Sequence, residues 1–255
     1  MASQSSVRSL KTIERTVEIV DLIQEMDGAR VSELAEALDV SPGTVHAYLS
    51  TLENSRYLVK EGDEYHIGLR FLSVGGYASN RKSSYRFIHQ KVKELADMTE
   101  ERAQFIVEEH GRGIHIHVGS SPSAVQADAR VGKEVSLHAS AAGKSILAHL
   151  DEHRIDEIVE RWGLPALTDN TISTRDELTE ELQTIRERGY SFNRCESIKS
   201  LRAVGVPVRK QDGSVLGALS VSGPANRLRG ELYEEEIPRQ LLGVANEIEL
   251  KIQYP

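Results

Sequence analysis

The sequence predicts an α+β protein in two parts: a small helical domain ending in a β-hairpin, then an antiparallel sheet flanked by helices. Three observations lead to this prediction. Apolar residues recur at helical spacing over about residues 10–55. Two short alternating runs, RYLVK and EYHIG, follow at once and are typical of paired strands. The rest of the chain mixes helical and strand patterns, and the polar tract SNRKSS near residue 80 separates the two parts.

The composition favours a globular protein of two modest domains. The chain has 255 residues, of which 39% are hydrophobic. No stretch approaches the roughly 18 apolar residues of a membrane helix, and the opening MASQSSVRSLK lacks the apolar centre of a signal peptide. Cys195 is the single cysteine, so no disulfide can form within the chain. We therefore expect a soluble, cytoplasmic protein with no membrane contact.

The charge of the chain limits how it would meet a nucleic acid. The formal net charge is -8, and residues 1–82 alone hold nine Lys and Arg against twelve Asp and Glu. Neutralisation of phosphates by Lys and Arg supplies most of the non-specific affinity of proteins for DNA. Any such contact must therefore depend on where the cations lie and not on how many there are.

Three helices are expected in the first domain. The first covers about residues 10–26 and ends at Asp-Gly. The second is VSELAEAL, in which Ser32 is expected to cap the helix. The third runs to about residue 55 and has the clearest start signal, because Ser41 is a good N-cap and Pro42 suits the first helical turn.

The second and third helices fit one helix-turn-helix frame. Ala35 is small enough for two helices to cross closely, and Val40 would fill the turn between them. The hairpin that turns at Glu-Gly-Asp, residues 61–63, would be the wing. An ordinary helical pair within a larger core is the alternative interpretation. The buried-type positions of the frame are Leu34, Ala35, Leu38, Val40, Val45 and Leu49.

A winged helix-turn-helix places its third helix in the major groove of DNA, where side chains of the first turns reach base edges. Nearby Lys and Arg side chains bind the phosphates. The base or backbone contacts are expected at Ser41, Thr44, His46, Ala47 and Ser50. The phosphate contacts are expected at Arg8, Lys11, Arg56 and Lys60, each of which is otherwise a solvated surface charge.

The remaining sequence divides into a linker helix and a mixed domain. We expect residues 1–68 to form the winged domain, 69–83 the linker helix and 84–255 the second domain. The expected helices of that domain cover about 85–98, 143–150, 154–161, 175–188 and 234–252. The expected strands cover 103–109, 114–118, 203–208 and 215–221, the last two forming a hairpin.

No catalytic or metal-binding motif is found. AAGKS at 141–145 resembles part of a P-loop, but His138 stands where that motif needs a glycine. His110, His115 and His117 are interpreted as part of a strand with one polar face, in preference to a metal site. Neither a G-x-S-x-G elbow nor an H-E-x-x-H helix is present. We expect no enzymatic activity, cofactor or metal.

Taken together, five ordered stretches resemble the IclR family of transcriptional regulators over nearly the whole chain. They are VRSLKTIERTVEIVDLI, VSELAEALDVSPGTVHAYLSTLENSRYLV, LHASAAGKSILA, RERGYSF and VPVRKQDGSVLGALSVSGP. The resemblance implies a winged-helix reader, a linker helix used in dimerisation and a GAF-like effector-binding domain. It also implies a homodimer or homotetramer that binds palindromic operators in double-stranded promoter DNA.

The resemblance further implies an effector pocket in the second domain. Its hydroxyl and amide groups would suit a small oxygen-rich ligand such as a sugar or organic-acid metabolite. By position, the pocket residues are Ala124, Ser140, Ala141, Asn193, Ala203, Ser220 and Ser222. The expected function is regulation of catabolic genes, as activator or repressor. The alternatives are an architectural DNA-binding protein without effector, and a small-molecule enzyme that uses the winged helix for oligomerisation.

Overall fold

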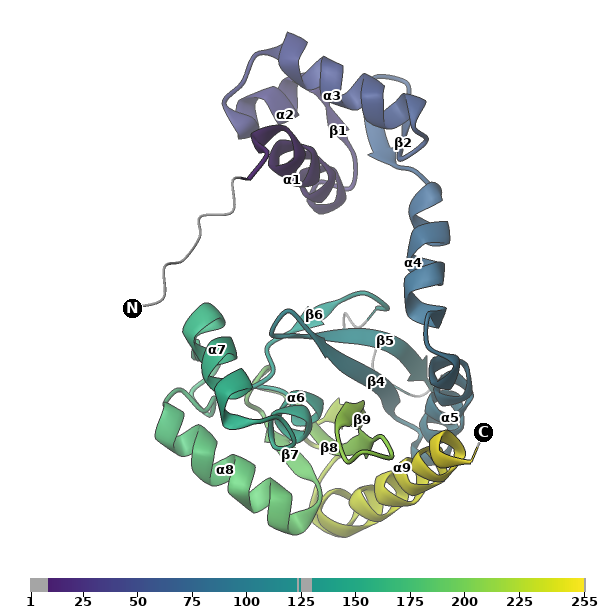
Figure 1. The fold of residues 1–255 in the computed structure, drawn as a ribbon, viewed down its shortest axis with the longest axis vertical. Helices are drawn as coiled ribbons and strands as arrows, with labels where there is room; N and C mark the ends of the chain where they lie inside the picture. Colours follow the sequence, from purple (N-terminus) through teal and green to yellow (C-terminus); the bar gives the residue numbers. More distant parts are fainter. Residues whose placement is uncertain (1–8, 123, 125–129, 255) are drawn as a thin grey trace. The chain divides into compact units, whose positions relative to one another are not determined.

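The computed structural model describes residues 9–122, 124 and 130–254. Contacts within the chain divide it into two units, residues 1–78 and 79–255 (Figure 1). The division falls within helix α4 (Arg70–Asn80), in the segment that the sequence predicts as a linker. Among the described residues, none of the helices combines the length and apolar content that crossing a membrane requires.

The first unit is a three-helix bundle with a small sheet. The predicted helix-turn-helix and wing are confirmed, and the sheet has the order β1-β3-β2. Its core is formed by apolar side chains from all three helices, among them Ile19, Leu34 and Leu49, which are fully buried. The elements are α1 (Lys11–Glu25), β1 (Ala29–Arg30), α2 (Val31–Leu38), α3 (Pro42–Asn54), β2 (Leu58–Glu61) and β3 (Glu64–Ile67).

The start of α3 is as predicted and the start of α2 is not. Ser41 is the N-cap of α3, and its Oγ accepts a hydrogen bond from the backbone N–H of Thr44 at 3.2 Å. Ser32 was the wrong cap for α2, because Arg30 occupies that position and its backbone N–H donates to Glu33 Oε2 at 2.7 Å. Pairing of Arg30 with Glu64 across β1 and β3 keeps this residue extended, so the helix begins directly after it.

The second unit is built on an antiparallel sheet, as predicted, and this sheet has six strands. The strand order is β6-β5-β4-β9-β8-β7. A single turn of π-helix, Leu232–Glu236, precedes the last helix. The helices are α5 (Ser83–Thr99), α6 (Ala141–Leu147), α7 (Glu152–Trp162), α8 (Arg175–Arg188) and α9 (Ile237–Gln253). The strands are β4 (Arg102–Glu109), β5 (Arg112–Ser120), β6 (Glu134–Val135), β7 (Ser191–Arg194), β8 (Leu201–Arg209) and β9 (Val215–Pro224).

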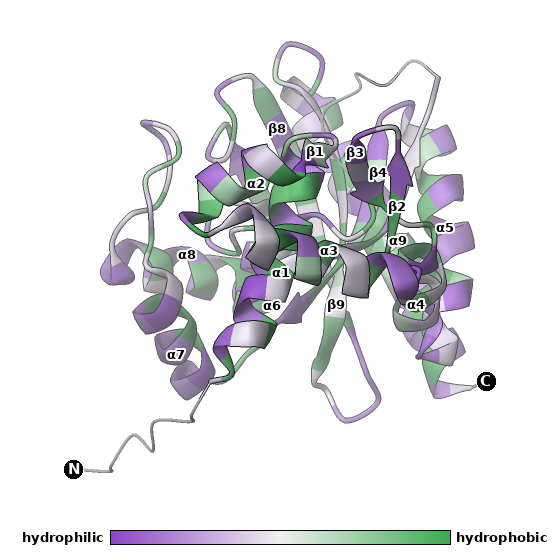
Figure 2. Ribbon diagram, turned by 90° about the horizontal axis from the view of Figure 1, so that it is seen from above, coloured by the Kyte–Doolittle hydropathy of each residue, from purple (hydrophilic) through white to green (hydrophobic). Residues whose placement is uncertain are grey.

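Helices cover both faces of this sheet and bury a separate apolar cluster on each. Helices α5 and α9 pack on one face, where Ile88 and Leu241 meet strand residues such as Val206. Helices α6, α7 and α8 cover the other face, with Ile146 and Leu182 in the buried cluster (Figure 1). In Figure 2, β9 is mainly hydrophobic, whereas α5 and α7 alternate hydrophobic and hydrophilic bands, as helices with one buried face do.

Two short strands of the second unit, β6 and β7, were not predicted from the sequence. Strand β7 has four residues and begins two residues after Gly189, where α8 ends in a left-handed conformation. It completes the edge of the sheet next to β8 and carries Asn193, one of the predicted pocket residues. The missing strand therefore bears directly on the candidate site.

Candidate functional sites

The exposed face of α3 carries the predicted base contacts. Thr44, His46 and Ala47 are exposed, and Ser50 is partly buried. Two hydrogen-bonded contacts order these side chains: Ser41 Oγ lies 2.9 Å from Thr44 Oγ1, and His46 Nδ1 lies 3.3 Å from Ser50 Oγ. The first turns of α3 thus present a hydrogen-bonding surface without acidic residues, lysine or arginine, of the kind that reads base edges.

The predicted phosphate contacts that the structure describes lie outside the first turns of α3. Lys11, Arg56 and Lys60 are exposed on α1, at the end of α3 and on the wing, respectively. Lys60 Nζ stacks over the Tyr65 ring at 5.3 Å from its centroid, which holds the lysine against the wing. Arg8 lies outside the described residues. The wing itself is mixed in charge, because Arg30 pairs there with Asp63 and Glu64.

The second unit contains a cavity of about 360 Å³. It lies between the sheet and the loop that leads into α6, and its volume is near the lower end of the range for small-molecule sites. Six of the seven predicted pocket residues line it: Ser140, Ala141, Asn193, Ala203, Ser220 and Ser222. Ala124 is described but does not line the cavity, and its backbone N–H donates to Ser121 O.

Strand register explains why residues from distant segments share this wall. Asn193 on β7 lies opposite Ala203 on β8, and Ala203 lies opposite Ser222 on β9. Ser222 in turn lies opposite Arg102 on β4. Directly opposed residues of neighbouring strands point to the same face, so these four form one row across the sheet. A second row, two residues along each strand, contains Ser220 on β9 and Gln104 on β4.

The α6 end of the cavity is fixed by a close helix-to-sheet approach. Ser140 caps α6, and its Oγ accepts from the backbone N–H of Gly143 at 3.1 Å. A Cβ atom at Gly205 of β8 would stand only 2.6 Å from the carbonyl carbon of Ala141. Glycine at this position therefore lets the start of α6 rest directly on the sheet and close one side of the cavity.

Asn193 lines the cavity, but its side-chain amide is engaged by the protein. Nδ2 donates to Ala139 O at 3.0 Å and to Ser197 Oγ at 2.9 Å, and Oδ1 accepts from the backbone N–H of Glu196 at 2.8 Å. Both amide protons are thus used. The contacts assign Asn193 the task of holding the loop after β7, and they leave only part of Oδ1 for a ligand.

Sequence reasoning missed the β4 and β5 side of the cavity. Arg102, Gln104, Arg112 and His115 all line it, and Arg102, Gln104 and His115 are buried. The alternation of Arg102 and Gln104 along β4 is a signal of a polar strand face. This face meets Ser222 because β4 pairs with β9, a strand about 120 residues further along the chain. The sequence alone does not predict this pairing.

Burial and neighbouring cations shift the ionisation of this side. Desolvation lowers the pKa of His115 to about 4, and the charges of Arg102 and Lys133 lower it further. Burial also lowers the pKa of Arg102 from its usual value, while Glu101 opposes that shift. His115 is therefore a neutral imidazole at pH 7. Among the described residues, no group of three or more His, Cys, Asp and Glu is placed to hold a metal ion.

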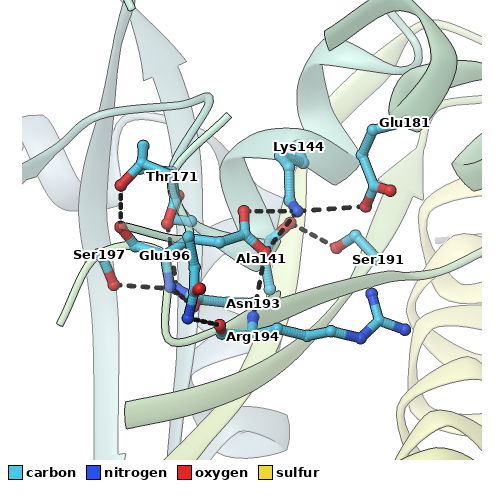
Figure 3. Close-up of polar contacts among 12 residues, drawn as sticks. Ala141, Lys144, Thr171, Glu181, Ser191, Asn193, Arg194, Glu196 and Ser197 are labelled. Atoms are coloured by element: carbon cyan, nitrogen blue, oxygen red, sulfur yellow. Dashed lines mark hydrogen bonds and ion pairs between the residues drawn. The ribbon is translucent and has the colours of Figure 1, made fainter. Parts of the chain in front are cut away.

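A buried ion-pair cluster lies behind the cavity wall (Figure 3). Lys144 Nζ is 2.7 Å from Glu196 Oε2 and 3.1 Å from Glu181 Oε1, and the lysine side chain is only 2% exposed. Glu196 also accepts from the backbone N–H of Arg194 at 3.0 Å. The lysine of AAGKS thus neutralises internal carboxylates and links α6 to α8 and to the loop after β7.

Comparison with known proteins identifies the class to which this arrangement belongs. The sequence matches the family profile of the IclR helix-turn-helix domain over residues 12–62. It also matches the profile described as bacterial transcriptional regulator IclR C-terminal, over residues 84–250. The probable HTH-type transcriptional regulator ArcR of Halobacterium salinarum is 32% identical, over 99% of this chain and 97% of its own length.

Two further similar proteins agree with this match to the IclR profiles. The acetate operon repressor of Salmonella typhimurium is 25% identical, over 94% of this chain and 89% of its own length. The solved structure of the IclR protein of Thermotoga maritima is 28% identical, with a TM-score of 0.81 and coverage of 96% of this chain and 100% of that one.

A winged helix-turn-helix joined to a cavity-bearing α+β domain defines a DNA-binding transcriptional regulator. The chain belongs to the IclR family, which confirms the resemblance given by its sequence motifs. The relatives are named as transcriptional regulators and not as enzymes, in agreement with the expectation that no catalytic activity is present.

Proposed function

We propose that this protein regulates catabolic genes in response to a small sugar or organic-acid metabolite that binds the cavity of the second unit. The observation that carries the proposal is the 360 Å³ cavity, whose wall bears aligned hydroxyl groups from β9 and the α6 cap. A concave site with a few convergent polar groups is typical of small-ligand binding. The name of one relative, acetate operon repressor, supports a catabolic role.

In this proposal α3 enters the major groove of a palindromic promoter site. Thr44, His46 and Ser50 contact bases or the sugar-phosphate backbone, while Ser41 and Ala47 lie at the same interface. Phosphate contacts come from Arg8 and from three exposed cations, Lys11, Arg56 and Lys60. A homodimer or homotetramer supplies the second reader that a palindrome requires.

The ligand acts by shifting an equilibrium between different arrangements of the winged helix-turn-helix domains within the oligomer. It can do so only through different affinities for those arrangements. Lys144 on α6 pairs with Glu181 on α8 and with Glu196, whose backbone N–H donates to Asn193 Oδ1 in the cavity wall, so the cluster offers a physical link from ligand to scaffold. The proposal makes no choice between activation and repression.

The test is genome-wide DNA occupancy, followed by binding to the occupied promoters with and without metabolites of the neighbouring operons. We expect discrete palindromic sites and a change in affinity with one metabolite. Replacing Thr44 and His46 by alanine should weaken binding to the specific site by about tenfold or more, because each good base contact contributes about 1–3 kcal/mol. Gln24→Ala, at an exposed position of α1, is the matched control. Diffuse occupancy that no metabolite alters would instead support an architectural DNA-binding protein.

A further inference from the structure

Two arginines oppose each other on the face of the sheet that lies away from the cavity. Arg194 on β7 stands directly opposite Arg202 on β8. Phe192 and Val204, two positions along the same strands, belong to the apolar cluster beneath α5 and α9, so both arginine side chains emerge on that face. Like charges in directly opposed positions of neighbouring strands destabilise a sheet. This pair therefore calls for a compensating negative charge.

Two aromatic rings hold these guanidinium groups and a third one in place. The guanidinium carbon of Arg194 lies 4.5 Å from the centroid of the Phe192 ring, and that of Arg188, the last residue of α8, lies 4.8 Å from the same centroid. Arg202 lies over the Tyr233 ring at 5.2 Å, and the two ring centroids are 4.7 Å apart. The three cations are thus positioned in advance, which lowers the entropic cost of binding a shared partner.

The carboxylates of the protein leave this group of cations positive. Neither Arg194 nor Arg202 forms an ion pair with a residue in the ranges 9–122 and 130–254. Arg188 Nη2 has one carboxylate oxygen nearby, Glu181 Oε1 at 3.9 Å, but that oxygen already accepts from Lys144 Nζ at 3.1 Å. The arginines therefore have positive charge in excess of their internal partners.

Burial adds to the cost of this excess charge. It lowers the pKa of Arg188 from its usual value; Glu181 opposes this shift, and the charge of Arg194 adds to it. Arg188 Nη2 and Arg202 Nε are also buried and make no hydrogen bond with any residue that the structure describes. Charged groups that are buried without full pairing are costly, and a bound anion would reduce that cost.

We propose that Arg188, Arg194 and Arg202 form a second ligand site, which binds a phosphate group on the side of the sheet opposite the cavity. Guanidinium groups donate pairs of N–H groups to phosphate oxygens, and three positive charges favour a dianion over a monoanion. Inorganic phosphate and a phosphate monoester share this chemistry. The site does not depend on which effector binds the cavity.

The exposed Arg194 gives a ligand access to this site. In Figure 3 its side chain extends away from Lys144 and Glu196, so the site is distinct from the buried ion-pair cluster. It is also distinct from the cavity, because Asn193 and Ala203, the neighbours of the two opposed arginines, line the cavity from the other face of the same strands.

The first experiment measures thermal unfolding and calorimetric binding of the full chain with inorganic phosphate, methyl phosphate and methyl sulfate. Ionic strength is held constant with NaCl, at about pH 8, where a phosphate monoester carries two negative charges. Methyl sulfate has the shape of methyl phosphate but a single charge. We expect at least one of the phosphates to raise the melting temperature and to bind at least about tenfold more tightly than methyl sulfate. Comparison of the two phosphates separates the free ion from an ester.

The second experiment repeats these titrations with variants. Arg194→Gln and Arg202→Gln should each weaken the tighter phosphate by about tenfold or more, and Arg194→Lys should retain part of the affinity. Arg229→Gln, at an exposed arginine outside the group, is the matched control and should leave the affinity unchanged. Ser222→Ala, in the cavity wall, should also leave it unchanged.

The outcomes are decisive for this site and leave the regulator of the preceding section untouched. Phosphates that bind no more tightly than methyl sulfate would overturn the proposal, and so would phosphate binding that survives Arg194→Gln and Arg202→Gln together. Loss of phosphate binding in Ser222→Ala alone would place the ion in the cavity instead.

A purely structural role of the arginines is tested by the ligand-free proteins. Because Arg194→Gln removes the repulsion with Arg202, its melting temperature without phosphate should not fall below that of the unaltered protein. A lower melting temperature combined with an unchanged phosphate affinity would show that the arginines only pack on the aromatic rings, and would overturn the proposal.

Discussion

Replacement of Lys144 by methionine gives the sharpest test of the buried cluster behind the cavity. The change keeps the length of the side chain but removes the ammonium group, which lies 2.7 Å from Glu196 Oε2 and 3.1 Å from Glu181 Oε1. The Glu196 side chain is only 6% exposed and would be left as an uncompensated buried charge. Loss of one partner from a buried pair costs about 3–5 kcal/mol.

For a domain of this size, that loss corresponds to a fall of about 6–20 °C in melting temperature. The assay is urea unfolding followed by Trp162 fluorescence, because Trp162 is the single tryptophan and lies on α7 of the same unit. Lys199→Met is the matched control, since Lys199 pairs at 3.1 Å with Asp169 on the surface. It should cost less than about 1 kcal/mol.

The double variant Lys144→Met, Glu196→Gln distinguishes a charge effect from simple loss of packing. With both charges removed, the double variant should be more stable than the sum of the single changes predicts, by about 1–3 kcal/mol. The reasoning would be refuted if the free energy of unfolding of Lys144→Met lay within about 1 kcal/mol of that of the unaltered protein. It would also be refuted if the effects of Lys144→Met and Glu196→Gln on this free energy were strictly additive in the double variant.

Three further predictions concern pH, packing and DNA. Burial lowers the pKa of His115 to about 4 in the folded protein, against about 6.5 in the unfolded chain, so the free energy of unfolding falls by up to about 3 kcal/mol as the pH drops from 6.5 to 4. Urea unfolding at several pH values should show a smaller fall for His115→Gln than for the unaltered protein. The control His153→Gln, at an exposed histidine, should not reduce the fall. Gly205→Ala should lower the free energy of unfolding by about 1–3 kcal/mol, whereas Gly243→Ala, in open space on α9, should not lower it. Lys60→Gln should reduce the slope of log affinity against log salt by about 1, and an unchanged slope would exclude a phosphate contact there.

Local signals were sufficient for most of the fold. Ser41 and Pro42 mark the start of α3 because capping acts within one helical turn. The Gln-Asp-Gly turn predicts the hairpin of β8 and β9 in the same way. Ser32 was assigned wrongly because pairing of β1 with β3, more than 30 residues apart, decides where α2 begins.

The candidate cavity was predictable only in part, for a similar reason. Ser220 and Ser222 alternate along one strand, so their common face follows from the sequence. The role of Arg102 depends on which strand lies beside β4, and that of Lys144 depends on two carboxylates from α8 and the β7 loop. Neither partner is near in sequence, so both residues first become visible in the folded chain.

The rows of opposed residues across the sheet have a consequence for how ligand preference can change over evolutionary time. The row from Asn193 to Arg102 crosses four strands, which at about 4.8 Å per step is about 14 Å. Each strand contributes one position to each row, so a single substitution alters one point of this grid and leaves the backbone pairing intact. Under the proposed function, a scaffold of this kind can acquire a preference for a new effector one side chain at a time while its winged helix-turn-helix unit stays the same.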